Sequence, residues 1–155
     1  MPSERYTAPA LPPKAINEKH GLAVLACDHS HSVSPYINEI NQGLHDFGNV
    51  MKANHKSASV IDVELLSFAD DVTCEVGFRP AAEYVAPTLR ASGCTAFNQS
   101  IIAALQDIRK RKDYYKSVGI SYWRPFLFVF SDGLPTDSEY EAEAKQMLQE
   151  AYDNK

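Results

Sequence analysis

The chain has 155 residues, which is enough for one domain with a sizeable core and too few for two. Its 45% hydrophobic and 23% charged residues are typical of a globular protein. Fifteen basic against twenty acidic residues leave a net charge of −5, which argues against a general nucleic-acid-binding surface. Seven acidic and two basic residues follow from Asp132 onward, so the excess negative charge belongs to the last segment.

No apolar run approaches the roughly 20 residues that span a bilayer, so we expect no membrane contact. Residues 1–20 contain several prolines, predict an irregular lead-in and lack the apolar core of an export signal. The three cysteines, Cys27, Cys74 and Cys94, are odd in number and have no CxxC spacing. We therefore expect each to be a small buried residue, and the protein to be cytoplasmic.

Residues 21–155 predict a single α/β domain with the element order β-α-β-β-α-β-α. Strands are expected at 22–27, 59–68, 72–78 and 125–130, and helices at about 35–56, 92–115 and 138–152. The alternation at 72–78, after an Asp70-Asp71 turn, predicts a half-exposed antiparallel hairpin. The first and last strands are unbroken apolar runs. They predict a mainly parallel central sheet with both faces covered, a three-layer Rossmann-like fold.

Polar side chains follow both unbroken apolar strands. Asp28 follows the first strand and Asp132 the last, and open parallel sheets bind ligands beyond the carboxyl ends of their strands. Ser30 and Ser32 alternate with Asp28, and alternate residues of an extended loop point the same way. Thr95 adds a hydroxyl before the second helix. Carboxylate and hydroxyl oxygens suit magnesium, manganese or calcium better than zinc, so these five residues predict a divalent-cation site.

Several motifs together resemble those of a von Willebrand factor A (vWA) domain. They are Asp-x-Ser-x-Ser after a buried strand, a Gly-x-Thr before a later helix, and Ser-Asp-Gly after a second apolar strand. Three stretches, 37–44, 91–96 and 119–125, look closer to the bacterial tellurium-resistance-associated branch of that family. The similarity covers roughly residues 20–150.

The resemblance implies a metal-ion-dependent adhesion site in which Ser30, Ser32 and Thr95 bind Mg²⁺ directly. Asp28 and Asp132 then act mainly through bound waters, and Mn²⁺ or Ca²⁺ are alternative ions. One open coordination position accepts an acidic side chain of a protein partner. The implied function is cation-dependent protein binding without catalysis, in a bacterial stress-response, tellurium-resistance or defence system.

Three features depart from the family pattern. His31 and Cys94 stand where the family usually has glycine, and a side chain tolerates positive φ less well. His29 and His31 offer nitrogen ligands or point outward over the rim of the site. The family also continues with further strands, so strand 125–131 is expected at a sheet edge. We expect a second copy or another chain to pair with this edge, or the sequence to be a fragment of a longer protein.

Two other functions remain open. Asp28 could be the nucleophile of a magnesium-dependent phosphoryl-transfer enzyme, although a second acid is expected two residues later and Ser30 stands there. The domain could also be an interaction module with an inactive metal site. Taken singly, Asp28 and Asp132 are better explained as caps of turns or helices, and only the five residues together favour a metal site.

Overall fold

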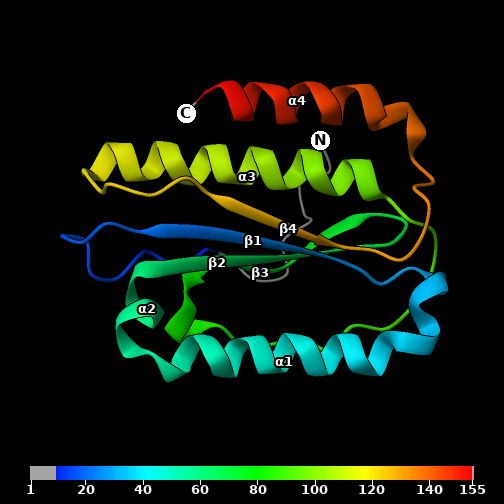
Figure 1. The fold of residues 1–155 in the computed structure, drawn as a ribbon, viewed down its shortest axis with the longest axis horizontal. Helices are drawn as coiled ribbons and strands as arrows, with labels where there is room; N and C mark the ends of the chain where they lie inside the picture. The colour runs from blue at the N-terminus through cyan, green and yellow to red at the C-terminus, as the bar shows by residue number, and fades with distance from the viewer. Residues whose placement is uncertain (1–9, 155) are drawn as a thin grey trace.

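The computed structural model describes residues 10–154, which form an open four-stranded sheet with helices on both faces (Figure 1). The strands are β1 (Gly21–Asp28), β2 (Ile61–Phe68), β3 (Val72–Pro80) and β4 (Phe126–Phe130). The helices are α1 (Ile37–Ala53), α2 (His55–Val60), α3 (Phe97–Val118) and α4 (Glu141–Asp153), with short 3-10 turns at His31–Tyr36, Ala81–Glu83 and Ser138–Tyr140. The predicted element order is therefore confirmed, with α2 an added short helix where the second strand was expected to begin.

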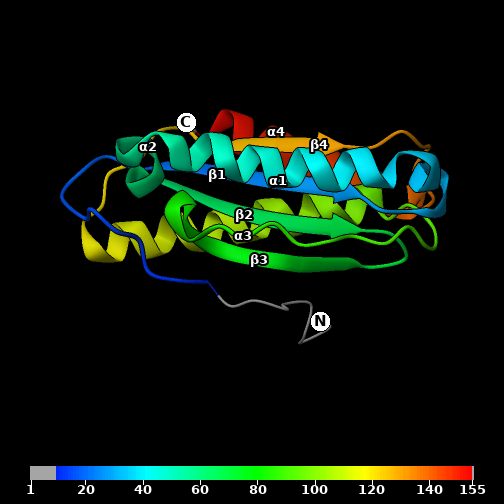
Figure 2. The same cartoon turned by 90° about the horizontal axis from the view of Figure 1, so that it is seen from below.

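The strand order is β3-β2-β1-β4, with β1 parallel to both β2 and β4 and with β2 antiparallel to β3. Helices α1 and α2 cover one face, whereas α3 and α4 cover the other (Figures 1 and 2). The predicted three-layer, mainly parallel α/β fold with one antiparallel edge hairpin is therefore correct. Of the helices within residues 10–154, none combines the length and apolarity that crossing a membrane requires.

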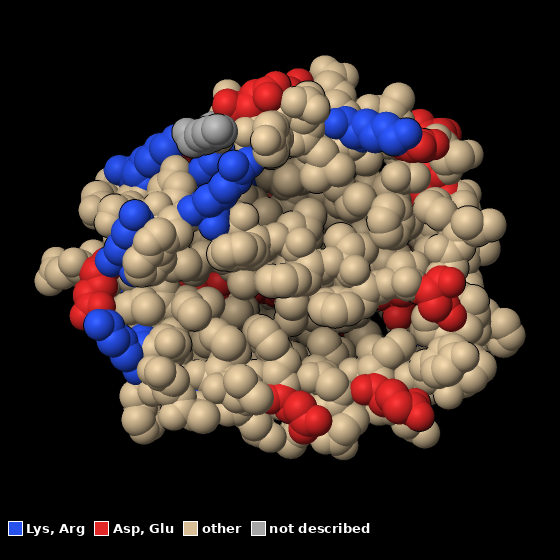
Figure 3. Space-filling model, viewed as in Figure 1, with Lys and Arg blue, Asp and Glu red and all other residues tan. Residues whose placement is uncertain are grey.

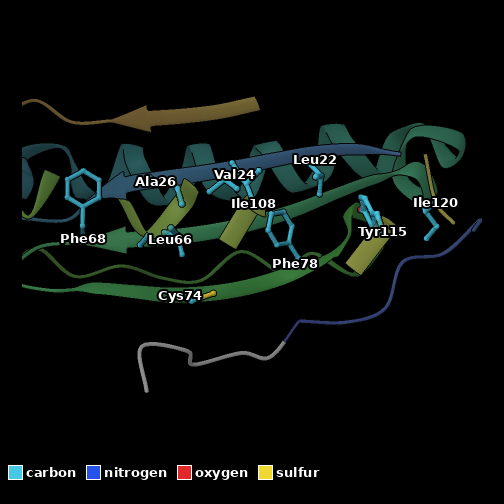
Figure 4. Packing of buried hydrophobic residues seen from close by; sticks show 12 residues of the cluster. Leu22, Val24, Ala26, Leu66, Phe68, Cys74, Phe78, Ile108, Tyr115 and Ile120 are labelled. Atoms are coloured by element: carbon cyan, nitrogen blue, oxygen red, sulfur yellow. The ribbon is translucent and has the colours of Figure 1, made fainter. Parts of the chain in front are cut away.

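Residues 22–27 of β1 are all apolar because each face of the strand packs against a helical layer. Leu22, Val24 and Ala26 belong to the core beneath α3, which Figure 4 shows with Phe78 and Tyr115. The intervening side chains, among them Leu25 and Cys27, belong to a second core beneath α1. Successive strand residues point to opposite faces, so a strand buried on both sides loses the polar alternation of a half-exposed one.

Strand β3 is less exposed than its alternating sequence predicts. Cys74, Val76 and Phe78 are buried, and none of the strand's other side chains is fully exposed. The lead-in runs close to it, since the backbone N–H of Leu11 donates to the carbonyl oxygen of Phe78 at 2.7 Å. Residues 10–19 contain no helix or strand, and the first nine residues of the predicted lead-in lie outside the described residues.

Strand β4 is the clearest disagreement between sequence and structure. Its lack of alternation predicts an interior strand, but among residues 10–154 it pairs with β1 alone and forms the edge of the sheet. Phe126, Phe128 and Phe130 are 62%, 46% and 53% exposed, whereas Leu127 and Val129 pack on the α3 side. The edge position itself agrees with the expectation drawn from the family resemblance. An unbroken apolar run cannot show which of its faces has a covering helix.

The cysteines also differ from one another. All three are free; Cys27 and Cys74 are buried as expected, whereas Cys94 is exposed on the loop before α3. The prediction of burial is therefore wrong for Cys94.

Candidate functional site

The candidate site lies where β1 and β4 end side by side. Cys27 is in register with Phe130, so Asp28 and the residues after Phe130 leave the sheet together. Asp28 is 1% exposed, and both of its carboxylate oxygens accept hydrogen bonds. The backbone N–H of Ser30 donates to Oδ1 at 2.7 Å, and Ser131 Oγ donates to Oδ2 at 2.7 Å. Asp28 therefore joins the loops that follow the two strands.

Ser30, Ser32 and Asp132 form a continuous chain of oxygen atoms. The hydroxyl oxygens of Ser30 and Ser32 are 2.9 Å apart, and Ser32 Oγ donates to Asp132 Oδ1 at 3.0 Å. Ser30 is buried, whereas Ser32 and Asp132 are exposed, so the chain runs from the end of the sheet to the surface. The loops that follow β1 and β4, both predicted from the sequence, thus place Ser32 and Asp132 next to each other.

A network of backbone contacts holds the loop that carries Thr95 against the loop after β1. His29 accepts at its carbonyl oxygen from Ser92 N at 2.8 Å, and His31 N donates to the carbonyl oxygen of Gly93 at 3.0 Å. Gly93 has a φ of +74°, and a Cβ there would lie 2.6 Å from a carboxylate oxygen of Asp70. That position requires glycine because of both the backbone conformation and the close approach.

Thr95 lies at the same site, next to the loop that follows β4. A Cβ built on Gly133 would lie 3.2 Å from Ser32 Oγ and 3.7 Å from Thr95 Oγ1, so both hydroxyls lie close to this glycine. Thr95 and Thr136 exchange two hydrogen bonds: Thr95 N donates to Thr136 Oγ1 at 2.9 Å, and Thr136 N donates to the Thr95 carbonyl at 3.0 Å. All five sequence-predicted residues therefore gather at one end of the sheet.

Three further residues organise the site and were not singled out in the sequence. They are Ser131, which holds Asp28, Thr136, which holds Thr95, and Asp137, which caps α3. Asp137 is buried and accepts from the backbone N–H groups of Asn98 at 3.1 Å and Gln99 at 2.8 Å. Only Ser131 had a sequence signal, its place in Ser-Asp-Gly; the other two act across 38 to 41 residues of chain.

The two departures from glycine fit without backbone strain. Among the non-glycine residues that the structure describes, only Ala15 has positive φ, so His31 and Cys94 occupy ordinary conformations. His29 Nδ1 lies 2.9 Å from the carbonyl oxygen of Arg90, which commits one ring nitrogen to the neighbouring loop. His31 is exposed.

The Cys27 thiol lies beside Asp28 at the inner end of the site. Burial raises the pKa of the Cys27 thiol to about 12, and the negative charge of Asp28 adds to this effect. The thiol is therefore protonated near neutral pH and is a poor metal ligand. The thiol lies beside a crevice of about 390 Å³, whose lining includes Val33, Tyr36, Ile40, Phe130 and Asp132.

The donor atoms fit a small hard cation. Oxygen ligands about 2.1 Å from an octahedral Mg²⁺ are about 3 Å from their neighbours. The hydroxyl oxygens of Ser30 and Ser32, which the resemblance assigns as direct ligands, are 2.9 Å apart, a hydrogen-bond length that is also compatible with this spacing. Within residues 10–154, no group of three or more His, Cys, Asp or Glu side chains is arranged to hold a metal. A cation here would depend on the serine and threonine hydroxyls.

Comparison with known proteins adds information about the fold. No family model matches the chain, and no curated protein is significantly similar to it. The structure is similar to the open conformation of the pilus adhesin SpaC from Lactobacillus rhamnosus GG, with a TM-score of 0.63, 16% sequence identity and 80% of this chain covered. A second crystal structure of SpaC gives a TM-score of 0.61, 15% identity and the same coverage of this chain. This chain spans only 16–17% of the adhesin's length, so the likeness is one of fold.

Proposed function

We propose that this chain is a divalent-cation-dependent protein-binding module of the vWA type, whose site comprises Asp28, Ser30, Ser32, Thr95 and Asp132. The observation that carries the proposal is the hydrogen-bonded chain of oxygen atoms from Ser30 through Ser32 to Asp132, which brings together two loops a hundred residues apart in the sequence. The Asp-x-Ser-x-Ser, Gly-x-Thr and Ser-Asp-Gly motifs all contribute residues to this one place.

The chemistry of the five residues suits binding to a carboxylate. Ser30, Ser32 and Thr95 would hold Mg²⁺ through neutral hydroxyls, which leave the cation strongly electrophilic. Asp28 is committed to Ser30 and Ser131, so it positions the loops and adds negative charge nearby. Ser32 and Asp132 are the exposed members, and a partner's Asp or Glu would complete the coordination on that side.

The burial of Asp28 favours binding over phosphoryl transfer. A nucleophilic carboxylate must reach the substrate, but this side chain is 1% exposed and both of its oxygens are engaged. The similarity of fold to a pilus adhesin is compatible with a role in adhesion, but it does not identify a ligand for this chain. The bacterial tellurium-resistance or defence setting, and the choice among Mg²⁺, Mn²⁺ and Ca²⁺, remain predictions from the resemblance.

Isothermal titration calorimetry with Mg²⁺, Mn²⁺ and Ca²⁺ tests the cation site directly. We expect saturable heat with at least one ion and a higher melting temperature in its presence, since an ion that binds only the folded state stabilises it. Ser30→Ala and Ser32→Ala should lose both effects. Ser117→Ala is the matched control, because its exposed hydroxyl bonds only within α3.

Absence of heat and of thermal shift with all three ions would refute the cation site and leave the inactive-module alternative. Hydrolysis of an aryl phosphate with Mg²⁺, abolished by Asp28→Asn, would instead establish the enzyme. Where a cation binds, capture of a partner in Mg²⁺ and its release by a chelator completes the test, with Ser32→Ala as the control bait.

A further inference from the structure

The turn between β2 and β3 lies against both loops that carry the proposed cation ligands of the first and second motifs. The carbonyl oxygen of Phe68 accepts from the backbone N–H of His29 at 3.0 Å, in the loop after β1. The carbonyl oxygen of Ala69 accepts from the N–H of Ala96 at 2.8 Å, directly after Thr95. The turn is therefore a common support for two loops that are far apart in the sequence.

Asp70, the next residue of this turn, holds the chain on the other side of Thr95. Its Oδ1 accepts from the backbone N–H of Cys94 at 2.8 Å. The same carboxylate packs against Gly93, where a Cβ would lie 2.6 Å from Oδ1, so the glycine of the Gly-x-Thr motif makes room for it. The two backbone N–H groups that flank Thr95 thus both donate to the turn, one to a carbonyl oxygen and one to the Asp70 side chain.

The rest of the connection between β3 and α3 is fixed independently of Asp70. Asn41 Nδ2 on α1 donates to the carbonyl oxygen of Leu89 at 2.9 Å, and the N–H of Leu89 donates to Asn41 Oδ1 at 2.8 Å. Ser92 and Gly93 are bonded to the loop after β1. Loss of the Asp70 contact would therefore release one N–H group beside Thr95 and leave the remainder of the loop in place.

Charge attracts Mg²⁺ and Ca²⁺ alike, so the choice between them depends on where the ligands lie. On the face that Figure 3 shows, the right-hand end below α4 carries acidic and no basic side chains, where β1 and β4 end in Figure 1. Mg²⁺ requires nearly ideal octahedral geometry at about 2.1 Å, whereas Ca²⁺ accepts oxygen ligands at about 2.3–2.6 Å in flexible arrangements. Thr95 is buried and held on both sides, which suits the smaller ion.

We propose that Asp70 is a positioning residue of the candidate cation site, which fixes Thr95 for Mg²⁺ and sets the preference for Mg²⁺ over Ca²⁺. The inference rests on the function proposed above, because it concerns the same site. Asp70 acts through the backbone of Cys94 and does not itself bind the cation. Its hydrogen bond, and not its charge, carries this role, so Asp70→Asn keeps the acceptor oxygen and preserves the preference.

Isothermal titration calorimetry with Mg²⁺ and Ca²⁺ tests the proposal on the wild type and three variants. We expect Asp70→Ala to weaken Mg²⁺ binding about tenfold and Ca²⁺ binding less, so that the ratio of the two affinities falls. Asp70→Asn should keep the ratio of the wild type. Asp71→Ala is the matched control, because it removes the same charge from the same exposed turn and should leave the ratio unchanged.

Amide hydrogen exchange of the cation-free protein supplies a second measurement. The N–H of Cys94 should exchange faster in Asp70→Ala, but not in Asp70→Asn or Asp71→Ala. A merely structural role would lower the free energy of unfolding, which urea denaturation measures, and would weaken both ions equally.

The outcomes separate this inference from the proposed function. If the wild type binds a cation but Asp70→Ala keeps its affinity ratio, or Asp70→Asn loses that ratio, the role of Asp70 is refuted and the cation site stands. If the wild type gives no heat with any of the ions, both the cation site and the role of Asp70 are refuted.

Discussion

Ser32 donates a hydrogen bond of 3.0 Å to Asp132, a residue one hundred positions further along the chain. The contact exists because β1 and β4 are neighbouring parallel strands that end level with each other. A second hydrogen bond joins the same two loops, in which Ser131 Oγ donates to Asp28 Oδ2 at 2.7 Å. The two loops are therefore joined by two hydrogen bonds, one to the buried Asp28 and one to the exposed Asp132. We expect substitution of these two aspartates to have different effects.

Asp28→Asn should reduce both stability and cation affinity, whereas Asp132→Asn should reduce only the affinity. Asp28 is buried and accepts one hydrogen bond on each carboxylate oxygen, whereas an asparagine side chain accepts on one oxygen only. We expect Asp28→Asn to lower the free energy of unfolding by about 1–3 kcal/mol. Asp132→Asn changes an exposed side chain. Loss of a group that orients metal ligands typically costs about 10–100-fold in affinity. Chemical denaturation and magnesium titration separate the two effects, and equal destabilisation by both substitutions would contradict this assignment.

Asp137→Ala should destabilise the protein by about 1–2 kcal/mol, because the first turn of α3 loses its cap. Thermal unfolding would show this as a melting temperature lower by about 2–8 °C. Glu139→Ala changes an exposed acid two residues away and is the control. A similar loss in both variants would mean that acidity of the segment, and not the cap, supplies the stability.

Tyr115→Phe should cost about 1–3 kcal/mol, because the buried Asp62 carboxylate loses a hydrogen-bond donor. Asp62 would keep Arg111, whose Nη2 is 3.2 Å from Oδ2. Tyr114→Phe removes a hydroxyl from a neighbouring ring that is 40% exposed, and should leave the free energy of unfolding unchanged. Urea denaturation measures both; a neutral Tyr115→Phe would show that Asp62 needs no hydroxyl partner.

The Cys27 thiol should make stability fall in strongly alkaline solution. Its folded pKa is raised to about 12 from an ordinary value of 9.0, so the thiol favours the folded state below about pH 9. That contribution is lost as the pH rises from 9 towards 12, where the unfolded chain ionises first. Cys27→Ala should therefore show a shallower decline in the free energy of unfolding across this range. Parallel declines in the two proteins would refute the assignment.

The sequence alone determined the order of the elements and most of the strands. Unbroken apolar runs predicted β1, and a three- to four-residue repeat predicted α1, because these patterns reflect local periodicity and burial. The motif residues at the strand ends could also be predicted from the sequence, since parallel strands bring their carboxyl ends to one edge of the sheet.

Only the tertiary structure decided which faces are covered and which loops meet. The run 126–130 is equally apolar in an interior and an edge strand, so the exposure of its phenylalanines depends on where helices pack. The hydrogen bonds of Asp137 to the first turn of α3 and of Tyr115 to Asp62 join residues about 40 to 50 positions apart. No local pattern encodes such partners, because their approach follows from the packing of whole elements.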